Sequence, residues 1–178
     1  MICKLRDDHL RVTLPELQAY AVVNLRYDQA VDLSRLNDPM RVRLASRWER
    51  PAGGEFRVRA DHSVEHAYDL NGLLQGRLHT HLRNPPSFLV NAARPAALIV
   101  HVRAVATQGA HLECRIDGRV ADAVDLPDLD GKNDSGASEY DRVITFPIPA
   151  GQHRVTLDNT GPDWVVLTWL EFQGAFKD

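Results

Sequence analysis

Apolar and polar side chains alternate along most of this chain at the two-residue period of a β-strand. Leu10, Val12 and Leu14 alternate before Pro15, and a second apolar run follows at 21–25, so two short strands are predicted there. The same alternation predicts further strands at 42–44, 56–58, 88–90, 97–105, 112–116, 143–148, 153–157 and 164–172. No ten-residue window carries a helical period. Short strands separated by turn residues are typical of an all-β, antiparallel β-sandwich.

Turn residues divide the chain. Asn37-Asp38-Pro39 interrupts the strand pattern, because the residue before a proline is disfavoured in a helix. The Pro51–Gly54 segment is the predicted boundary between an N-terminal β segment at 1–50 and a β-sandwich at 51–178. Within the second part, Asp117-Gly118 predicts the tight turn of a hairpin.

The composition narrows the choice of partners. The 178 residues suit one domain or one domain with an appendage, and a formal charge of -3 argues against a nucleic-acid or anionic-membrane surface. No apolar run approaches a membrane span, and the first residues do not form a signal peptide, so the sequence leaves localisation undetermined. Cys3 and Cys114 are too few for a disulfide framework, and the sequence does not decide whether they pair.

The search for catalytic motifs finds none. G-x-S-x-G, the P-loop, G-x-G-x-x-G and H-E-x-x-H are all missing from the sequence. His79 and His81 would share one face of a strand and could bind zinc with two further ligands. No cysteine or acidic partner stands at a suitable spacing, so exposed or hydrogen-bonded histidines are the favoured interpretation.

One acidic loop resembles a cation site in part. Four carboxylates of the segment 128–139 match positions 1, 3, 7 and 12 of the calcium-loop template: Asp128, Asp130, Asp134 and Glu139. Lys132 stands where an oxygen ligand is expected, and Asn133 replaces the required glycine, so an EF-hand is rejected. Two interpretations stay open: a looser structural calcium site, and a polar loop whose side chains bond its own backbone.

The tryptophans allow two roles, core packing or a ligand platform. Alternation places Trp164 on one face with Val166, Leu170 and Phe172, and this apolar face favours core packing for Trp164. Trp169 falls on the opposite face with Val165, Leu167 and Glu171. Trp48 stands near the predicted boundary, which favours a domain interface over a ligand contact.

Several motifs in order give the chain a family resemblance. "RNPPSFLV", "LPDLDGKND", "EYD", "FPIPAGQHRVTLDNTGPDW" and "LTWLEF" make the span from about 73 to 172 resemble a galactose-binding-like, jelly-roll β-sandwich of the kind attached to bacterial glycoside hydrolases. Residues 9–25 are similar to the last strands of the β-domain that follows the catalytic barrel in some of these enzymes. No catalytic motif of those enzymes matches, so the resemblance implies no catalytic role.

The resemblance implies binding of a polysaccharide or oligosaccharide, next to a catalytic domain of the same parent protein. Sugar recognition needs an apolar surface for the ring and polar side chains for the hydroxyl groups. The candidate site combines Asp163, Trp164, His81 and Asn84 at a loop end. Two alternatives remain open. One is a structural sandwich that packs on a catalytic domain and has no ligand of its own, and the other is a small hydrolase.

Overall fold

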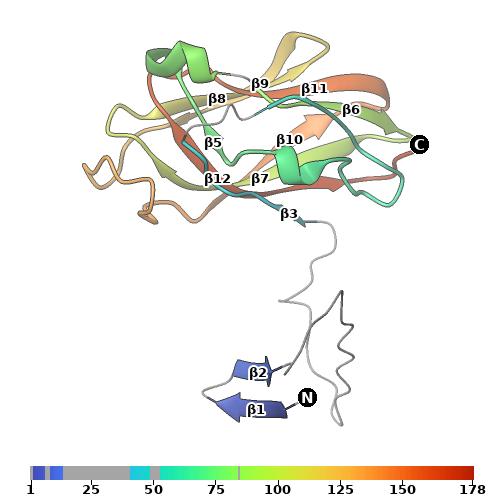
Figure 1. Cartoon of the computed structure of the whole chain (residues 1–178). Coiled ribbons are helices and arrows are strands. Elements are labelled where there is room, and N and C mark those ends of the chain that lie inside the picture. The colour runs from blue at the N-terminus through green and yellow to red at the C-terminus, as the bar shows by residue number, and fades with distance from the viewer. Residues whose placement is uncertain (1, 7–8, 14–40, 49–52, 84) are drawn as a thin grey trace. The chain divides into compact units, whose positions relative to one another are not determined.

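The computed structural model describes residues 2–6, 9–13, 41–48, 53–83 and 85–178 (Figure 1). The chain divides into two compact units, Met1–Asn37 and Asp38–Asp178. In the first unit, β1 (Ile2–Arg6) pairs antiparallel with β2 (His9–Thr13). The predicted strand through Leu10 and Val12 is thereby confirmed, whereas the strand expected at 21–25 lies outside the described residues.

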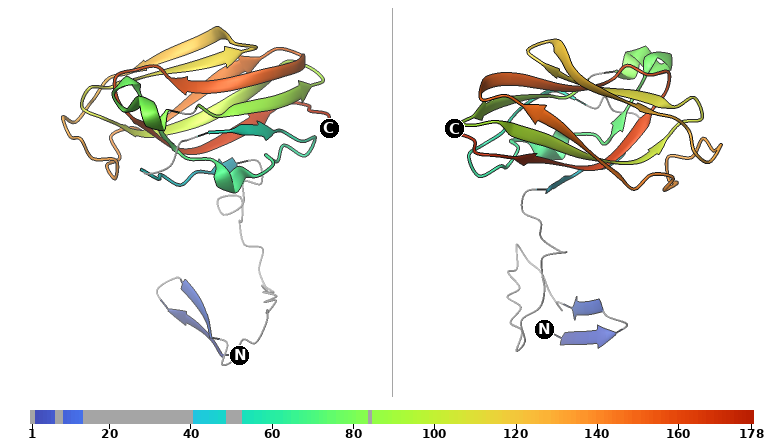
Figure 2. Two further views of the ribbon diagram at one scale, coloured as in Figure 1. Left: turned by 45° about the horizontal axis from the view of Figure 1, so that its top comes forward. Right: turned by 180° about the vertical axis from the view of Figure 1, so that it is seen from behind.

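The second unit is a β-sandwich, as the alternation predicts (Figures 1 and 2). In its described part, one sheet has the strand order β10-β7-β12-β3, with β5 also paired to β12, and the other has the order β4-β6-β11-β8-β9. The strands are β3 (Arg41–Arg43), β4 (Glu55–Arg57), β5 (Leu73–Leu74), β6 (Ser87–Ala92), β7 (Ala96–Val105), β8 (Ala110–Ile116), β9 (Arg119–Leu126), β10 (Arg142–Ile148), β11 (Gly151–Asn159) and β12 (Val165–Gln173). All pairs are antiparallel except β4 with β6.

Helical structure in the described residues is limited to two 3-10 segments, η2 (Ala67–Asp69) and η3 (Arg77–Leu82). His79 and His81 therefore do not lie on a strand, and the argument that they share a strand face is wrong. None of the described helices has the length and apolar character needed to cross a membrane.

The main core lies between the two sheets. Phe88 of β6 and Phe172 of β12 come from opposite sheets, are fully buried, and meet with ring centroids 5.1 Å apart. Aliphatic side chains from both sheets fill the same cluster, including Leu98, Leu112 and Leu157. Burying each such side chain contributes roughly 1.5–3 kcal/mol, so the alternating apolar faces hold the layers together.

A second, smaller apolar cluster involves β12, and it corrects the predicted face of that strand. Leu170 and Phe172 belong to the main core, but Trp164 and Val166 pack in the second cluster with Leu73, Ala104 and Ala106. The register of β12 against β7 shifts between Val166 and Leu167 and again before Trp169. An extra residue in a strand exchanges its two faces, so simple alternation along 164–172 fails.

The N-terminal limit of the sandwich also differs from the expected one. β3 pairs with β12, and Val42 lies opposite Leu170. Residues 41–43 are therefore part of a sandwich sheet, and the compact units divide between Asn37 and Asp38 rather than at Pro51–Gly54. A three-residue strand has too few alternating positions to be assigned to a sheet from sequence.

Cys114 is a free thiol on β8 and is completely buried. Burial, assisted by the negative charge of Asp122, raises the pKa of this thiol to about 12. The thiol therefore stays protonated at neutral pH and acts as a small apolar core group.

The hairpin turn between β8 and β9 forms as predicted at Asp117 and Gly118. Both residues have positive φ, 52° and 82°, as the tightest hairpin turns require. The Asp117 carboxylate also reaches β11, where it accepts hydrogen bonds from the Arg154 backbone N–H at 2.9 Å and from His153 Nδ1 at 2.8 Å. His153 Nε2 lies 3.2 Å from the Ala150 carbonyl oxygen, so the charged imidazolium ring can donate at both nitrogens.

This arrangement predicts a pH-dependent contribution to stability. The hydrogen bond to Asp117 raises the pKa of His153 above 6.5, and the bonds from Arg154 and His153 lower the pKa of Asp117 below 3.8. The His153 contribution is present below pH 6.5 and is lost as the pH rises through the raised pKa. The Asp117 contribution is present above pH 3.8 and is lost as the pH falls through the lowered pKa.

We therefore expect the free energy of unfolding of the wild type to exceed that of His153→Gln at about pH 5.5, and the gap to narrow by about pH 8.5. Urea unfolding at both pH values measures this gap. His66→Gln changes an exposed histidine elsewhere on the sandwich and should show no such pH-dependent gap. An equal gap for His153→Gln at both pH values would contradict the assignment.

Candidate functional site

The turn after β11 is held together by one buried side chain, Asn159. Its Nδ2 donates to the carbonyl oxygens of Leu74 at 3.0 Å and Asp163 at 2.6 Å. Its Oδ1 accepts from the backbone N–H groups of Gly161 at 3.0 Å and His111 at 3.2 Å. The amide thus uses both donor hydrogens and both acceptor positions. In doing so it joins β5, β8 and its own turn.

Two glycines let the neighbouring backbones approach this turn. A Cβ atom on Gly161 would lie 2.3 Å from the His111 nitrogen, and one on Gly76 would lie 2.5 Å from the Asp163 carbonyl oxygen. The start of η3 then bonds the turn directly, because the Arg77 N–H donates to the Gly161 carbonyl oxygen at 2.9 Å. The "DNTGPDW" motif is therefore built into the framework at this end of the sandwich.

Trp164 and Asp163 both serve this framework. Trp164 is 2% exposed and packs in the second apolar cluster, so its indole has no open face for a sugar ring. The structure thus supports the core interpretation of Trp164 and not its predicted role as a platform. Asp163 is also buried, and its Oδ1 accepts from the Trp164 N–H at 2.8 Å.

The other predicted contacts do not gather around Asp163. His81 is exposed in η3, and the histidine beside the Asp163 carboxylate is His79, with Nε2 3.6 Å from Oδ1. Asn84 lies outside the described residues. Trp48, predicted to lie at a domain interface, is 46% exposed and meets Trp164 edge-on with ring centroids 5.7 Å apart.

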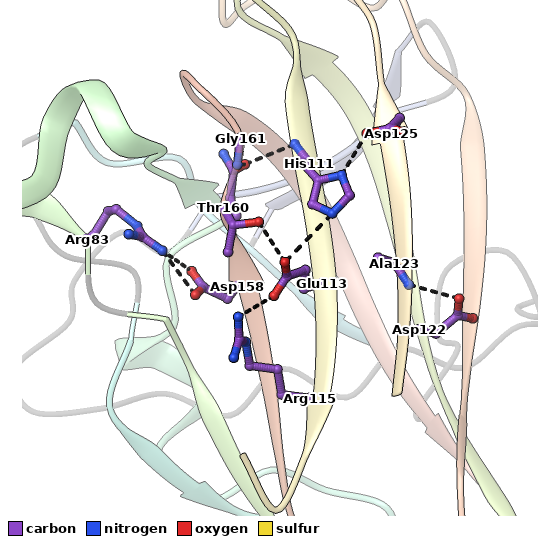
Figure 3. A network of polar contacts seen from close by, with 11 residues as sticks. Arg83, His111, Glu113, Arg115, Asp122, Ala123, Asp125, Asp158, Thr160 and Gly161 are labelled. Carbon is purple, nitrogen blue, oxygen red and sulfur yellow. Dashed lines mark hydrogen bonds and ion pairs between the residues drawn. The ribbon is translucent and has the colours of Figure 1, made fainter. Parts of the chain in front are cut away.

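Residues that alternate with the framework positions point away from the core and form a polar network (Figure 3). On β11, Asp158 accepts two hydrogen bonds from Arg83 Nη2, at 2.9 and 3.0 Å. One residue past the strand, Thr160 Oγ1 donates to Glu113 Oε1 of β8 at 2.9 Å. Arg115 contacts the other oxygen of Glu113. The network therefore links β8, β11 and the segment after η3 on the outer face of one sheet.

Glu113 and Asp158 are direct cross-strand partners in the β8–β11 register. Two like charges in that position repel each other, and both side chains are mostly buried, at 14% exposure each. Arg83 offsets the charge of Asp158 and Arg115 offsets that of Glu113, so the repulsion between the two carboxylates is compensated within a four-residue array. Such an array fixes donors and acceptors in place before any ligand arrives.

A hollow of about 610 Å³ adjoins this network at the end of β8. Its polar wall contains His111, Asp125 and Thr160, and His111 Nδ1 lies 2.6 Å from Asp125 Oδ1. His111 Nε2 lies 3.7 Å from Glu113 Oε1, which connects the hollow to the network. Pro127 and Pro162 contribute apolar surface to the same hollow. Its size falls in the range of roughly 300–1,000 Å³ typical of small-molecule sites.

Sequence reasoning missed these residues, although a signal for them exists. His111, Glu113 and Arg115 alternate with the apolar Leu112, Cys114 and Ile116 in "HLECRI". Their alternation predicts one polar face on β8, and the same pattern recurs on β11 at Thr156 and Asp158. What the sequence does not show is that β8 and β11 are neighbours.

The acidic loop brings together a different carboxylate set from the expected one. One oxygen each from Asp128, Asp130 and Glu139 lies within 4.8 Å of the others. Asp134 is not in this group, and its Oδ1 accepts from the Gly136 N–H at 2.8 Å. Glu139 also accepts backbone hydrogen bonds from Val105 at 2.6 Å and Leu129 at 2.9 Å. The loop thus has both the oxygen cluster and the backbone-bonding character that the two interpretations require.

Comparison with solved structures finds carbohydrate-binding modules and a β-glucosidase. The fold is similar to that of a family 35 carbohydrate-binding module from an environmental isolate, with a TM-score of 0.39, 13% identity, and coverage of 49% of this chain and 64% of the module. A family 35 module of Cellvibrio japonicus is similar with a TM-score of 0.34 and 19% identity. The match covers 50% of this chain and 64% of the module. A β-glucosidase of Paenibacillus barengoltzii has a TM-score of 0.38 and 13% identity to this chain. The match covers 67% of this chain and 11% of the enzyme.

This chain therefore spans 64% of the length of each of the two modules. No protein-family model and no curated protein matches the sequence.

The Asn159 amide leads to a prediction about stability. Asn159→Asp keeps the shape but replaces the two donor hydrogens with an oxygen that faces the carbonyls of Leu74 and Asp163. We expect a loss of about 2–4 kcal/mol in the free energy of unfolding, measured with urea at neutral pH. Asn133→Asp makes the same chemical change in an exposed loop and should cost less than about 0.5 kcal/mol. Equal stability losses in the two variants would contradict the framework role of Asn159.

Proposed function

We propose that the sandwich unit binds carbohydrate in the hollow beside β8, without catalysing a reaction. The observation that carries the proposal is the composition of this hollow, which sets His111, Asp125 and Thr160 against the rings of Pro127 and Pro162. A pyranose has the matching character, because its C–H faces are apolar and its hydroxyl groups both donate and accept hydrogen bonds. A site of this kind can recognise a neutral sugar through fixed polar contacts and apolar packing.

The polar network supports this proposal by preorganisation. Glu113 accepts a hydrogen bond from Thr160 and lies 3.7 Å from His111 Nε2, so two side chains of the hollow wall are held in place before a ligand binds (Figure 3). Ordering a long side chain costs on the order of 1 kcal/mol, so a rigid array favours binding. The array also presents guanidinium donors and carboxylate acceptors within one sheet face, and sugar hydroxyl groups need both.

The same contacts favour binding over hydrolysis. Glycoside hydrolysis requires one carboxyl group that delivers a proton and a second that acts as base or nucleophile. Glu113 and Asp158 are the adjacent carboxylates of this face, and each is engaged by an arginine. A carboxylate held by a guanidinium group is poorly suited to deliver a proton to a leaving group.

We further propose that the parent protein is a glycoside hydrolase and that this unit tethers it to polysaccharide. The support is the sequence resemblance of residues 9–25 and of the motifs between 73 and 172 to parts of such enzymes. Tethering raises the effective concentration of the catalytic domain at its substrate without a new catalytic contact. The competing proposal is a structural sandwich without a ligand of its own, and the framework role of the "DNTGPDW" motif favours it.

Binding assays on a panel of soluble and insoluble glycans distinguish these proposals. We expect the purified chain to be retained by one glycan class, and His111→Ala to weaken that binding at least about tenfold through loss of a wall contact. His66→Ala, which changes an exposed histidine that lines neither hollow of the described sandwich, should bind as the wild type does. Retention of the wild type by no glycan would leave the structural role as the better proposal.

We also propose that Asp128, Asp130 and Glu139 bind a structural calcium ion. Clustered carboxylate oxygens are the ligands that calcium prefers. Lys132 Nζ lies 3.6 Å from Asp130 Oδ2 and would have to move aside when the ion binds. The ion would link the acidic loop to β7, because Glu139 already bonds the Val105 backbone N–H.

Calcium at a hundred times its dissociation constant should raise the free energy of unfolding by about 2.7 kcal/mol. We therefore expect calcium to raise the Tm of the wild type by several degrees and a chelator to reverse the effect. Asp130→Asn should lose most of this response, whereas Asp134→Asn, whose carboxylate lies outside the cluster, should keep it. A response that is absent in the wild type, or lost equally in both variants, would exclude the three-residue site.

A further inference from the structure

The outer face of the β4-β6-β11-β8-β9 sheet carries a second hollow, of about 340 Å³, at the opposite end of β11 from Thr160. It forms where β4 leaves the edge of β6 and the C-terminal segment takes its place. Arg57 of β4 lies beside Leu89 of β6, and two residues further along β6 the Asn91 carbonyl oxygen accepts from the Lys177 N–H at 2.9 Å. The change of edge strand brings two separate segments of the chain to one hollow.

Cationic side chains stand on both sides of this hollow. Leu89 is in register with Arg57 on one neighbouring strand and with Arg154 on the other, and partners in register point to the same face of a sheet. The apolar Leu89 side chain therefore lies between two guanidinium-bearing residues. Lys177 lines the same hollow, together with the side-chain amides of Asn91 and Gln152.

Some charged side chains around this hollow have hydrogen-bond or ion-pair partners, and others have none in the described residues. Asp117 is bonded to His153 and to the Arg154 N–H, and Asp178 Oδ1 accepts from the Ala60 N–H at 3.0 Å. Arg154 forms an ion pair with Glu55. In contrast, the Arg57 and Lys177 side chains have no hydrogen-bond or ion-pair partner in the described part of the chain.

Arg57 and Lys177 thus share the hollow with the carboxylates of Asp117 and Asp178. Both oxygens of Asp117 and Oδ1 of Asp178 already accept hydrogen bonds from the chain itself, whereas the two cations have no partner in the described residues. An unpaired cation pair attracts an anion, and amide N–H groups beside it can donate to oxygen atoms. We infer that Arg57, Lys177, Asn91 and Gln152 form a binding site for an oxyanion, a phosphate or sulfate group. The group is either a free ion or a substituent on a sugar. This site is distinct from the proposed carbohydrate hollow and does not depend on it.

Titration with inorganic phosphate at constant ionic strength tests this inference. We expect the wild-type chain to bind phosphate, with amide NMR shifts centred on Asn91 and Lys177. Arg57→Gln combined with Lys177→Gln should weaken phosphate binding about tenfold or more. Both side chains are exposed, so the double variant should retain the wild-type urea midpoint, which serves as its folding check.

The matched control is Arg119→Gln with Arg142→Gln, which removes the same charge from exposed residues that line neither hollow. This control should bind phosphate as the wild type does. A comparison of phosphate with glucose 6-phosphate, and glucose as the uncharged reference, identifies the source of the group. Equal affinity for phosphate and glucose 6-phosphate indicates a free ion, and tighter binding of glucose 6-phosphate indicates a sugar substituent.

Three outcomes would overturn the inference: no phosphate binding by the wild type, unchanged binding in the Arg57/Lys177 double variant, or equal loss in both double variants. His111→Ala should leave phosphate binding intact, and the Arg57/Lys177 double variant should leave retention by neutral glycans intact. Failure of the anion site and failure of the carbohydrate proposal therefore give different results.

Discussion

The four hydrogen bonds of the Asn159 amide are the contact on which this end of the sandwich depends. They connect β5, β8 and the turn between β11 and β12 at the point where the β8–β11 ladder ends with the Leu112–Asn159 pair. A buried amide with all four positions used tolerates little displacement of its partners, because each lost bond leaves an unsatisfied polar group. The same bonds hold part of the wall of the larger hollow in place, because His111 and Gly161 line that hollow and both donate to Asn159.

The same short segment serves two purposes through strand alternation. Leu157 and Asn159 face inward, where one fills the core and the other fixes the turn. Asp158 and Thr160 face outward and form part of the polar network. The motif that carries the family resemblance is therefore mainly a folding motif, and its outward residues contribute to the site only because the inward ones place them.

Much of the fold could be predicted from the sequence, because it depends on local patterns. The alternation at 97–105 and 143–148 and the Asp117-Gly118 turn each express a preference of a few adjacent residues, and the structure has strands and a hairpin turn there. The faces of β12 could not be predicted, because its register shifts arise from pairing with β7. The candidate site was missed for a related reason. Glu113 and Asp158 are 45 positions apart in sequence and become neighbours only through the β8–β11 register.

The two hollows on one sheet face differ in how their charges are balanced, and β11 fixes the distance between them. Gln152 lines one hollow and Thr160 the other, and eight residues of strand place them about 27 Å apart. A monosaccharide cannot span that distance, so we expect small ligands at the two proposed sites to bind independently. Only an extended polymer that follows β11 could occupy both. Such a polymer would meet paired charges at the Thr160 end, which suit neutral hydroxyl groups, and unpaired cations at the Gln152 end, which suit an anionic substituent. The pairing of charges is therefore what distinguishes the ligands proposed for the two ends of this face.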